Sequence, residues 1–153
     1  MSDAVEVRIQ REFDSDHAVP LPSFQTVGAA GADLRANLAT EFVTIERGER
    51  SLIPTGIRLA VPIGYEAQIR PRSGLALQYG LMVCNAPGTI DSDYRGPIGV
   101  ILLNTGQEAV KISHGSRIAQ LIVAPVVQAR FVISKNLDDT ARGDSGFGST
   151  GLD

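Results

Sequence analysis

The sequence predicts an all-β subunit of the jelly-roll or sandwich kind, with one short helix. Short apolar runs rich in β-branched residues recur along the chain, and glycine and proline separate them. Only one segment is typical of a helix, so the pattern lacks the crossover helices that a parallel sheet requires. The 153 residues suit a single domain with a core of its own, and 43% of them are hydrophobic.

The expected elements follow in chain order. Alternating or continuous apolar residues predict strands over 5–9, 57–61, 67–69, 81–83, 98–103, 118–123 and 130–133. One or two helical turns are expected over 74–79, with Ser73 as the N-cap. The final segment, 141–153, contains four glycines and few apolar residues, which predicts a flexible tail after a domain over 1–140.

Charge and cysteine content narrow the class of protein. Fourteen Lys and Arg against 17 Asp and Glu give a net charge of −3, which does not favour nucleic acid as a partner. A single cysteine, Cys84, favours a reducing compartment, and we expect a cytoplasmic protein without a signal peptide. The longest apolar run, Leu121–Val127, is too short to span a membrane, so no membrane partner is expected.

Several kinds of catalytic site lack their motifs. One cysteine and two histidines, His17 and His114, give no spacing typical of a zinc site. The sequence contains neither a P-loop nor the GxSxG turn of serine hydrolases. We expect Cys84 to be buried and His114 to lie in a surface turn, with no role in chemistry.

Five segments combine glycine with polar residues where a plain sandwich would not need them. They are Ala29–Ala36, Pro71–Ala76, Asn85–Gly96, Gly115–Leu121 and Arg142–Gly151. In this order and spacing they resemble the five motifs of the trimeric dUTP diphosphatases, the dUTPases, over about residues 20–151. The resemblance implies a homotrimer with active sites at the subunit interfaces. It also implies Mg²⁺-dependent hydrolysis of dUTP to dUMP and pyrophosphate, which keeps uracil out of DNA and supplies dUMP for thymidylate synthesis.

Asp91 is the candidate catalytic residue. A carboxylate with an ordinary pKa of about 3.9 is ionised at neutral pH and can hold a water molecule. The resemblance implies that Asp91 activates the water that attacks the α-phosphate. Asp93 is the nearest competitor, and the family pattern makes it structural. The residues alone leave open that Asp91 is a turn residue at the tip of a hairpin.

The same segment supplies candidates for base and sugar recognition. The Asn85 amide offers an acceptor and donors, which can pair with the uracil edge. The resemblance implies that backbone groups of Thr89, Ile90 and Gly99 complete this contact. It also implies that Tyr94 packs under the deoxyribose, where a 2′-hydroxyl would not fit. On the residues alone, a turn asparagine and a half-buried strand tyrosine remain possible.

Phosphate binding is expected from two segments. Arg72, Ser73 and Gly74 combine a guanidinium, a hydroxyl and room for close backbone approach, a combination suited to an anion. The resemblance assigns them to the phosphates and assigns Gln120 to the α-phosphate. Arg117 is expected to support the subunit interface or the hairpin.

The metal and the tail follow from the resemblance. Mg²⁺ prefers phosphate oxygens and water, so Asp33 is expected only to contact water of a metal held by the substrate; the alternative is a turn residue. The tail becomes an arm that closes over a neighbouring subunit's site. Its contacts would be Arg142 with the γ-phosphate, Phe147 stacked on uracil, and donors from Gly148 and Ser149. Asp144 adds a negative charge to the arm without an assigned role.

Two alternatives remain for the function. The first is an enzyme of the same fold, a dCTP deaminase or a bifunctional dCTP deaminase–diphosphatase. The second is a non-catalytic binding trimer on the same scaffold. The Asn85 segment and the complete fifth motif favour the diphosphatase over the deaminase. The presence of all the residues expected to carry the chemistry favours an enzyme over the non-catalytic trimer.

Overall fold

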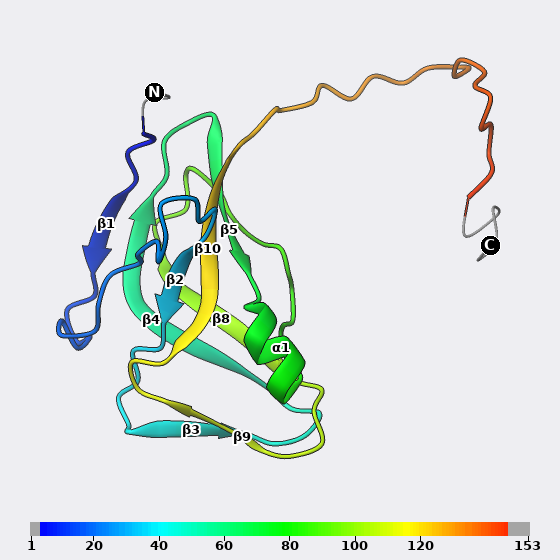
Figure 1. Cartoon of the computed structure of the whole chain (residues 1–153). Helices are drawn as coiled ribbons and strands as arrows, with labels where there is room; N and C mark the ends of the chain where they lie inside the picture. Colours follow the sequence, from blue (N-terminus) through cyan, green and yellow to red (C-terminus); the bar gives the residue numbers. More distant parts are fainter. Residues whose placement is uncertain (1–3, 147–153) are drawn as a thin grey trace.

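The computed structural model describes residues 4–146 as two four-stranded sheets, a two-stranded sheet and one helix (Figure 1). The first sheet has the order β1 (Arg8–Arg11), β4 (Arg50–Ala60), β8 (Pro97–Asn104) and β6 (Leu81–Val83). The second has the order β2 (Ala32–Arg35), β10 (Arg117–Pro125), β5 (Tyr65–Arg70) and β7 (Gly88–Ile90). The third joins β3 (Phe42–Ile45) to β9 (Val110–Ser113), and α1 spans Ser73–Tyr79. All these strand pairs are antiparallel, which confirms the all-β prediction.

One core joins the two larger sheets. In β8, burial alternates along the strand, and Ile98, Val100 and Leu102 point inward. Their inward neighbours on the opposite sheet include Ile69 and Ala119, and all belong to a single cluster of buried side chains. This alternation is the period-2 pattern that a half-buried strand requires, so the apolar runs of the sequence do mark the core.

Most expected elements agree with the structure, with several exceptions. Strands overlap all the predicted runs but 130–133, which is not a strand, and the short β2, β3, β7 and β9 were not expected. Ser73 is not the N-cap of α1, because the helix begins at Ser73 and Arg72 occupies the cap without a side-chain bond. The helix ends at Gly80, whose φ of 67° is left-handed and favours glycine.

The expected hairpin around Asp91 is also wrong. β7 pairs with β5 in the second sheet, whereas β8 pairs with β4 and β6 in the first. Residues 91–96 therefore form a corner between the two sheets, which we call the corner segment. The first candidate pocket lies at this corner.

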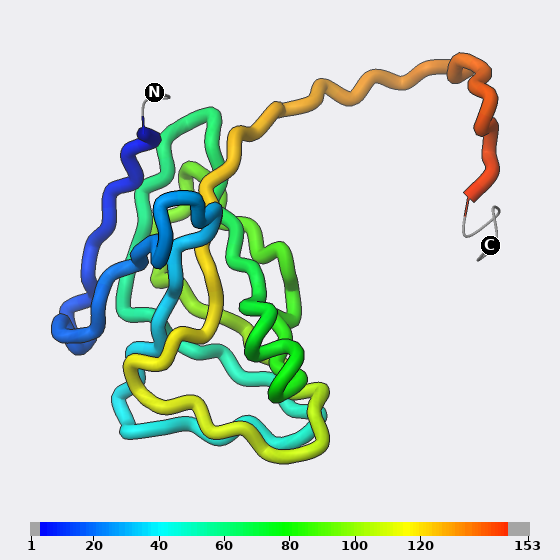
Figure 2. The backbone as a smooth tube through the Cα atoms, in the orientation of Figure 1, coloured from blue at the N-terminus to red at the C-terminus, as the bar shows by residue number. Residues whose placement is uncertain are grey.

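The chain leaves the sheets after β10. Val126 donates its N–H to the carbonyl of Gly64 at 2.9 Å, and residues 127–145 beyond it are all exposed. Figures 1 and 2 show this C-terminal segment, residues 126–146, running away from the sheets in orange and red. Within residues 4–146, no helix is long and apolar enough to cross a membrane.

Candidate active site

A cavity of about 190 Å³ lies at the bend between β7 and β8. We call it the corner pocket. Its lining is made of Ile69, Asn85, Gly88, Thr89, Ile90, Asp91, Tyr94, Pro97, Ile98 and Gly99. The candidates from residues 85–99 for the base, the sugar and the attacking water therefore all line one small cavity. Asp93, the competitor of Asp91, is exposed and is not part of this lining.

The corner segment is held by its own hydrogen bonds. Arg95 Nη1 donates to the carbonyls of Ser92 and Tyr94, each at 2.7 Å. The N–H of Tyr94 donates to the carbonyl of Asp91 at 3.2 Å, and the Tyr94 hydroxyl donates to the carbonyl of Pro97 at 3.1 Å. A guanidinium that binds two carbonyls of one turn fixes the turn, so Asp91 and Tyr94 face the pocket from a constrained backbone.

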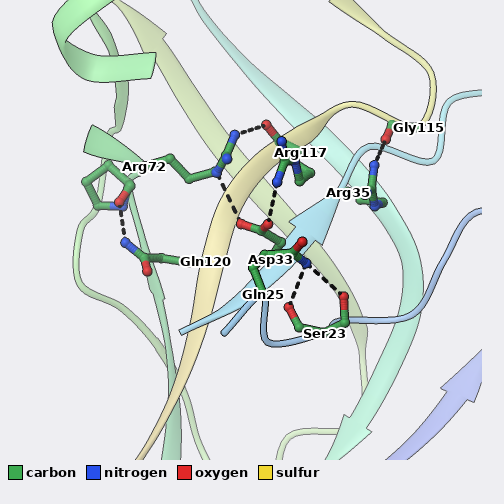
Figure 3. Close-up of polar contacts among 9 residues, drawn as sticks. Ser23, Gln25, Asp33, Arg35, Arg72, Gly115, Arg117 and Gln120 are labelled. Carbon is green, nitrogen blue, oxygen red and sulfur yellow. Dashed lines mark hydrogen bonds and ion pairs between the residues drawn. The ribbon is translucent and has the colours of Figure 1, made fainter. Parts of the chain in front are cut away.

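A second polar group lies on β2 and β10 and at the end of β5. Asp33 accepts from Arg72 Nε at 3.1 Å and from Arg117 Nη1 at 3.2 Å, and its side chain is only 11% exposed (Figure 3). Arg72 Nη1 also donates to the carbonyl of Arg117 at 3.2 Å. We call Asp33, Arg72, Arg117 and Gln120 the Asp33 cluster. Two guanidinium groups around one carboxylate leave the cluster with an excess of positive charge, which suits an anion.

Gln120 lies beside Asp33 on the neighbouring strand β10. It lies in register between Asp33 of β2 and Arg70 of β5. Its amide donates to the carbonyl of Pro71 at 2.9 Å. A Cβ at Gly31 would lie 3.1 Å from Gln120 Cβ and closer still to Gln120 Oε1. Only glycine fits at position 31, because the Gln120 side chain occupies the space that a Cβ would need.

The structure corrects several interpretations of single residues. Asp33 is not a turn residue, because it lies within β2 and is paired with two arginines. Arg117 belongs to the Asp33 cluster, which the sequence did not indicate. Ser73 and Gly74 are exposed at the start of α1, next to Arg72. Cys84 is exposed, so the expectation that it is buried is wrong.

The corner pocket and the Asp33 cluster both involve the second sheet. Ile90 of β7 pairs with Ala67 of β5, which pairs in turn with Val123 of β10. Gln120 therefore lies two strand spacings across the sheet and three residues along it from Ile90. These steps correspond to roughly 14 Å between the backbones of Ile90 and Gln120. The backbone of Ile69, which also lines the pocket, is closer, because Ile69 pairs with Leu121 next to Gln120.

The arm residues lie away from both groups. Arg142 is exposed in the C-terminal segment, and its Nε donates to the carbonyl of Ser145 at 2.9 Å. Asp144 is exposed in the same turn. Phe147, Gly148 and Ser149 lie outside the described residues.

The residues of the Asp33 cluster fit a metal that the protein holds only indirectly. Within residues 4–146, no group of three or more His, Cys, Asp or Glu side chains could hold a metal ion. Asp33 is the single carboxylate of the cluster, and each of its oxygens already accepts from an arginine. A carboxylate has about four acceptor positions, so Asp33 can still accept from water bound to a metal.

Sequence reasoning missed two residues of the corner segment. Arg95 binds the carbonyls of the turn, and Gly96 lies directly beneath the Tyr94 ring. The only signal for either residue is its place in the third motif, because both act through contacts that appear only when the chain folds.

Comparison with known proteins gives a consistent result. The family model described as dUTPase matches residues 17–151. The chain is 58% identical to the deoxyuridine 5′-triphosphate nucleotidohydrolase of Roseobacter denitrificans, over 97% of this chain and 98% of that protein. It is 60% identical to the protein of the same name from Dinoroseobacter shibae, over 95% of this chain and 96% of that protein.

Solved structures share the fold. The dUTPase of Staphylococcus bacteriophage 80alpha with dUPNHPP superimposes with a TM-score of 0.84 at 22% identity, covering 96% of this chain and 99% of that one. A mutant dUTPase from phage phi11 of S. aureus, described with a structural Mg(II) ion, has a TM-score of 0.74 at 19% identity, covering 86% of this chain and 97% of that one. At these identities the likeness concerns the fold.

Proposed function

This chain belongs to the dUTPase family and hydrolyses dUTP to dUMP and pyrophosphate, and from that premise we propose that the corner pocket binds the deoxyuridine with Asp91 as the general base. The observation that carries the proposal is that Asp91 lines the same small cavity as Asn85 and Tyr94. A nucleoside in this cavity has its 5′-phosphate near the rim, where a carboxylate can accept a proton from the attacking water.

Base selection follows from the pocket walls. The Asn85 amide and the backbone groups of Thr89, Ile90 and Gly99 offer fixed donors and acceptors to the uracil edge. The amino group of cytosine would face a donor and leave buried groups unpaired, which costs about 1–3 kcal/mol for each such group. Buried polar groups thereby reject the wrong base more strongly than an apolar pocket could.

The Asp33 cluster would bind the triphosphate. Arg72 binds Asp33, and Gln120 donates to the carbonyl of Pro71, the residue before Arg72. Ser73 and Gly74 add a hydroxyl and backbone N–H groups that have no acceptor within the helix. We assign Gln120 to the α-phosphate. Arg72 pairs with Asp33 in the free chain. Phosphate oxygens would therefore either replace Asp33 on this guanidinium or bind it together with Asp33.

Mg²⁺ would be held mainly by the substrate phosphates, with Asp33 in contact with its waters. When bound, the metal supplies positive charge that offsets the charge of the triphosphate and orients it. The protein contributes one shielded carboxylate whose position the two arginines fix.

The resemblance to trimeric dUTPases supports a homotrimer with sites at the subunit interfaces, in which the corner pocket of one chain faces the Asp33 cluster of another. The C-terminal arm would complete the site, with Arg142 on the γ-phosphate, Phe147 on uracil, and donors from Gly148 and Ser149. The cytoplasmic location stays a prediction, which rests on the single cysteine.

The Asp91 assignment is tested by pyrophosphate release from dUTP with Mg²⁺. Asp91→Asn keeps the size of the side chain and removes the base, so kcat should fall at least about 100-fold while KM changes little. Asp93→Asn is the matched control, because it makes the same charge change in the same segment outside the pocket lining. A wild-type kcat in Asp91→Asn would remove Asp91 from the base role.

The alternative of dCTP deamination is separated by one further substrate. With dCTP, the proposal expects neither ammonia nor pyrophosphate at a rate comparable to dUTP turnover. Ammonia release at such a rate would assign the chain a deaminase activity as well.

A further inference from the structure

We propose that Gly96 is a specificity-determining residue, because it provides the space in which the Tyr94 ring lies. The inference rests on the proposed role of Tyr94 as the residue that excludes a 2′-hydroxyl. Gly96 itself does not line the corner pocket, so it would act only through Tyr94.

The Tyr94 ring folds back over Gly96. A Cβ built at position 96 would lie 2.8 Å from Tyr94 Cε2 and closer still to Cζ and Oη. Carbon atoms in favourable contact are about 3.5–4.0 Å apart, so even one methyl group cannot share this space with the ring. Any residue other than glycine at this position must therefore displace the ring or the backbone.

The backbone at Gly96 does not itself require glycine. Its φ lies outside the left-handed region, unlike that of Gly56 or Gly64. Alanine could adopt the same backbone conformation without strain. The requirement for glycine at position 96 is therefore the volume of the Tyr94 ring.

The ring gives way more easily than the backbone. Arg95 Nη1 holds the carbonyls of Ser92 and Tyr94 at 2.7 Å, and Arg58 Nη1 donates to the carbonyl of Arg95 at 3.3 Å. Tyr94 is 44% exposed, and one hydrogen bond at 3.1 Å, from its hydroxyl to Pro97, holds its tip. A Cβ at position 96 would break this bond and rotate the ring away from its place in the lining of the pocket.

The consequence concerns sugar selection. A ring that no longer lies against the pocket stops excluding a 2′-hydroxyl, so UTP gains access. We expect Gly96→Ala to lower the ratio of kcat/KM for dUTP to that for UTP by about 10-fold or more, in the range that one steric contact provides.

The experiment combines kinetics with a crystal structure of the variant. The kcat/KM values for dUTP and UTP are measured for wild type, Gly96→Ala, Tyr94→Ala and the double variant. Gly28→Ala is the matched control, because a Cβ at position 28 has no atom within 4 Å and its φ is also outside the left-handed region. Thermal unfolding of each variant verifies that it folds.

The inference expects three results together. The Tyr94 ring is rotated in Gly96→Ala, Gly28→Ala keeps the wild-type ratio, and Gly96→Ala has no further effect on the ratio once Tyr94 is alanine. The inference is wrong if the Tyr94 ring of Gly96→Ala keeps its wild-type position. It is also wrong if Gly96→Ala changes the dUTP-to-UTP ratio equally in the wild type and in Tyr94→Ala.

The experiment distinguishes a failure of the proposed role of Tyr94 from a failure of the inference about Gly96. If Gly96→Ala and Tyr94→Ala both leave the ratio unchanged, the proposed role of Tyr94 is wrong and the inference falls with it. If only Tyr94→Ala lowers the ratio, the role of Tyr94 stands and the inference about Gly96 is wrong.

Discussion

At the scale of single residues, His114 joins two distant parts of the chain. The N–H of Leu38 donates to His114 Nδ1 at 3.0 Å, and because a backbone N–H can only donate, the ring proton lies on Nε2. Nε2 faces Asp16 Oδ2 at 3.0 Å, and the N–H of Ala18 donates to Asp16 Oδ1 at 2.8 Å. Asn37 bonds to both backbone groups of Asp16 at 3.0 and 2.9 Å. The loop before β2 is thereby fixed to the turn before β10.

The charge of Asp16 should make the stability of the fold depend on pH. The Ala18 N–H, and next the bond from His114, lower the pKa of Asp16 below its ordinary value of 3.8. A lowered native pKa stabilises the fold above the unfolded pKa, and this contribution is lost as pH falls through the native value. Asp16→Asn should therefore unfold more easily than wild type near neutral pH, and the difference should vanish once the pH is below the native pKa.

Urea unfolding at a series of pH values measures this difference. Asp14→Asn is the control, because Asp14 is exposed in the same loop. A stability gap for Asp16→Asn that is the same at every pH would mean that the charge of Asp16 does not stabilise the loop.

At the scale of elements, β4 lies between β1 and β8 and contains an irregularity in its pairing. It pairs with β8 over its first half, shifts register between Pro54 and Arg58, and pairs with β1 over its last four residues. Gly56 lies at the shift with a φ of 69°, and a Cβ there would be 2.7 Å from Asn37 Nδ2 and from Ser15 Cβ. Glycine is therefore required at position 56 for two reasons, its left-handed backbone and the lack of space for a Cβ.

Gly56→Ala should lower the free energy of unfolding by about 2–4 kcal/mol, because strain and a steric clash add. Gly48→Ala separates the two effects, since Gly48 has a φ of 79° and open space around its Cβ position. That control should cost only about 1 kcal/mol. Equal losses in the two variants, measured by denaturant unfolding, would show that the clash with Asn37 and Ser15 does not matter.

The elements that the sequence failed to predict share a physical feature. β2, β3, β7 and β9 have only three or four residues each, which makes an alternating pattern hard to detect. β6 is as short, but its continuous apolar run Leu81–Val83 was enough to predict it. β2 in addition carries Asp33 inside the fold, where arginines distant in sequence neutralise it. The corner segment was expected to be a hairpin because hairpins are local, whereas the choice of sheet depends on non-local pairing.

At the scale of the whole molecule, the C-terminal segment exposes apolar side chains. Val127, Phe131, Ile133 and Leu137 are between 88% and 99% exposed. The run 130–133, whose composition predicted a strand, pairs with no strand among the described residues.

Removal of residues 142–153 tests the arm as a separate functional part. Because residues 142–145 are exposed and bind mainly within their own turn, the truncated chain should keep its fold and its mass in solution. Without closure over the substrate, kcat should fall about 100-fold. Steady-state kinetics and a measurement of the assembly's mass in solution test this. A wild-type kcat in the truncated chain would contradict the closing role of the arm. A smaller number of chains in the assembly would show that the arm also holds the assembly together.

The sequence predicted which residues belong to the candidate site, but it did not predict how they are arranged in space. Asn85, Asp91 and Tyr94 were expected together because they are close in the chain, and they line one cavity. The pairing of Asp33 with Arg72 and Arg117 joins three segments that the chain order does not bring together. The bonds of Arg95 depend on the bend itself, so no pattern of residue types indicates them.

The most direct test is a crystal structure with Mg²⁺ and a non-hydrolysable dUTP analogue. The account predicts uracil in the corner pocket and a water molecule between the Asp91 carboxylate and the α-phosphorus, within hydrogen-bond range of about 2.6–3.2 Å from the carboxylate. It also predicts that the Gln120 next to this phosphate comes from a neighbouring copy of the chain. A uracil bound elsewhere, or an Asp91 side chain turned away from the phosphorus, would contradict it.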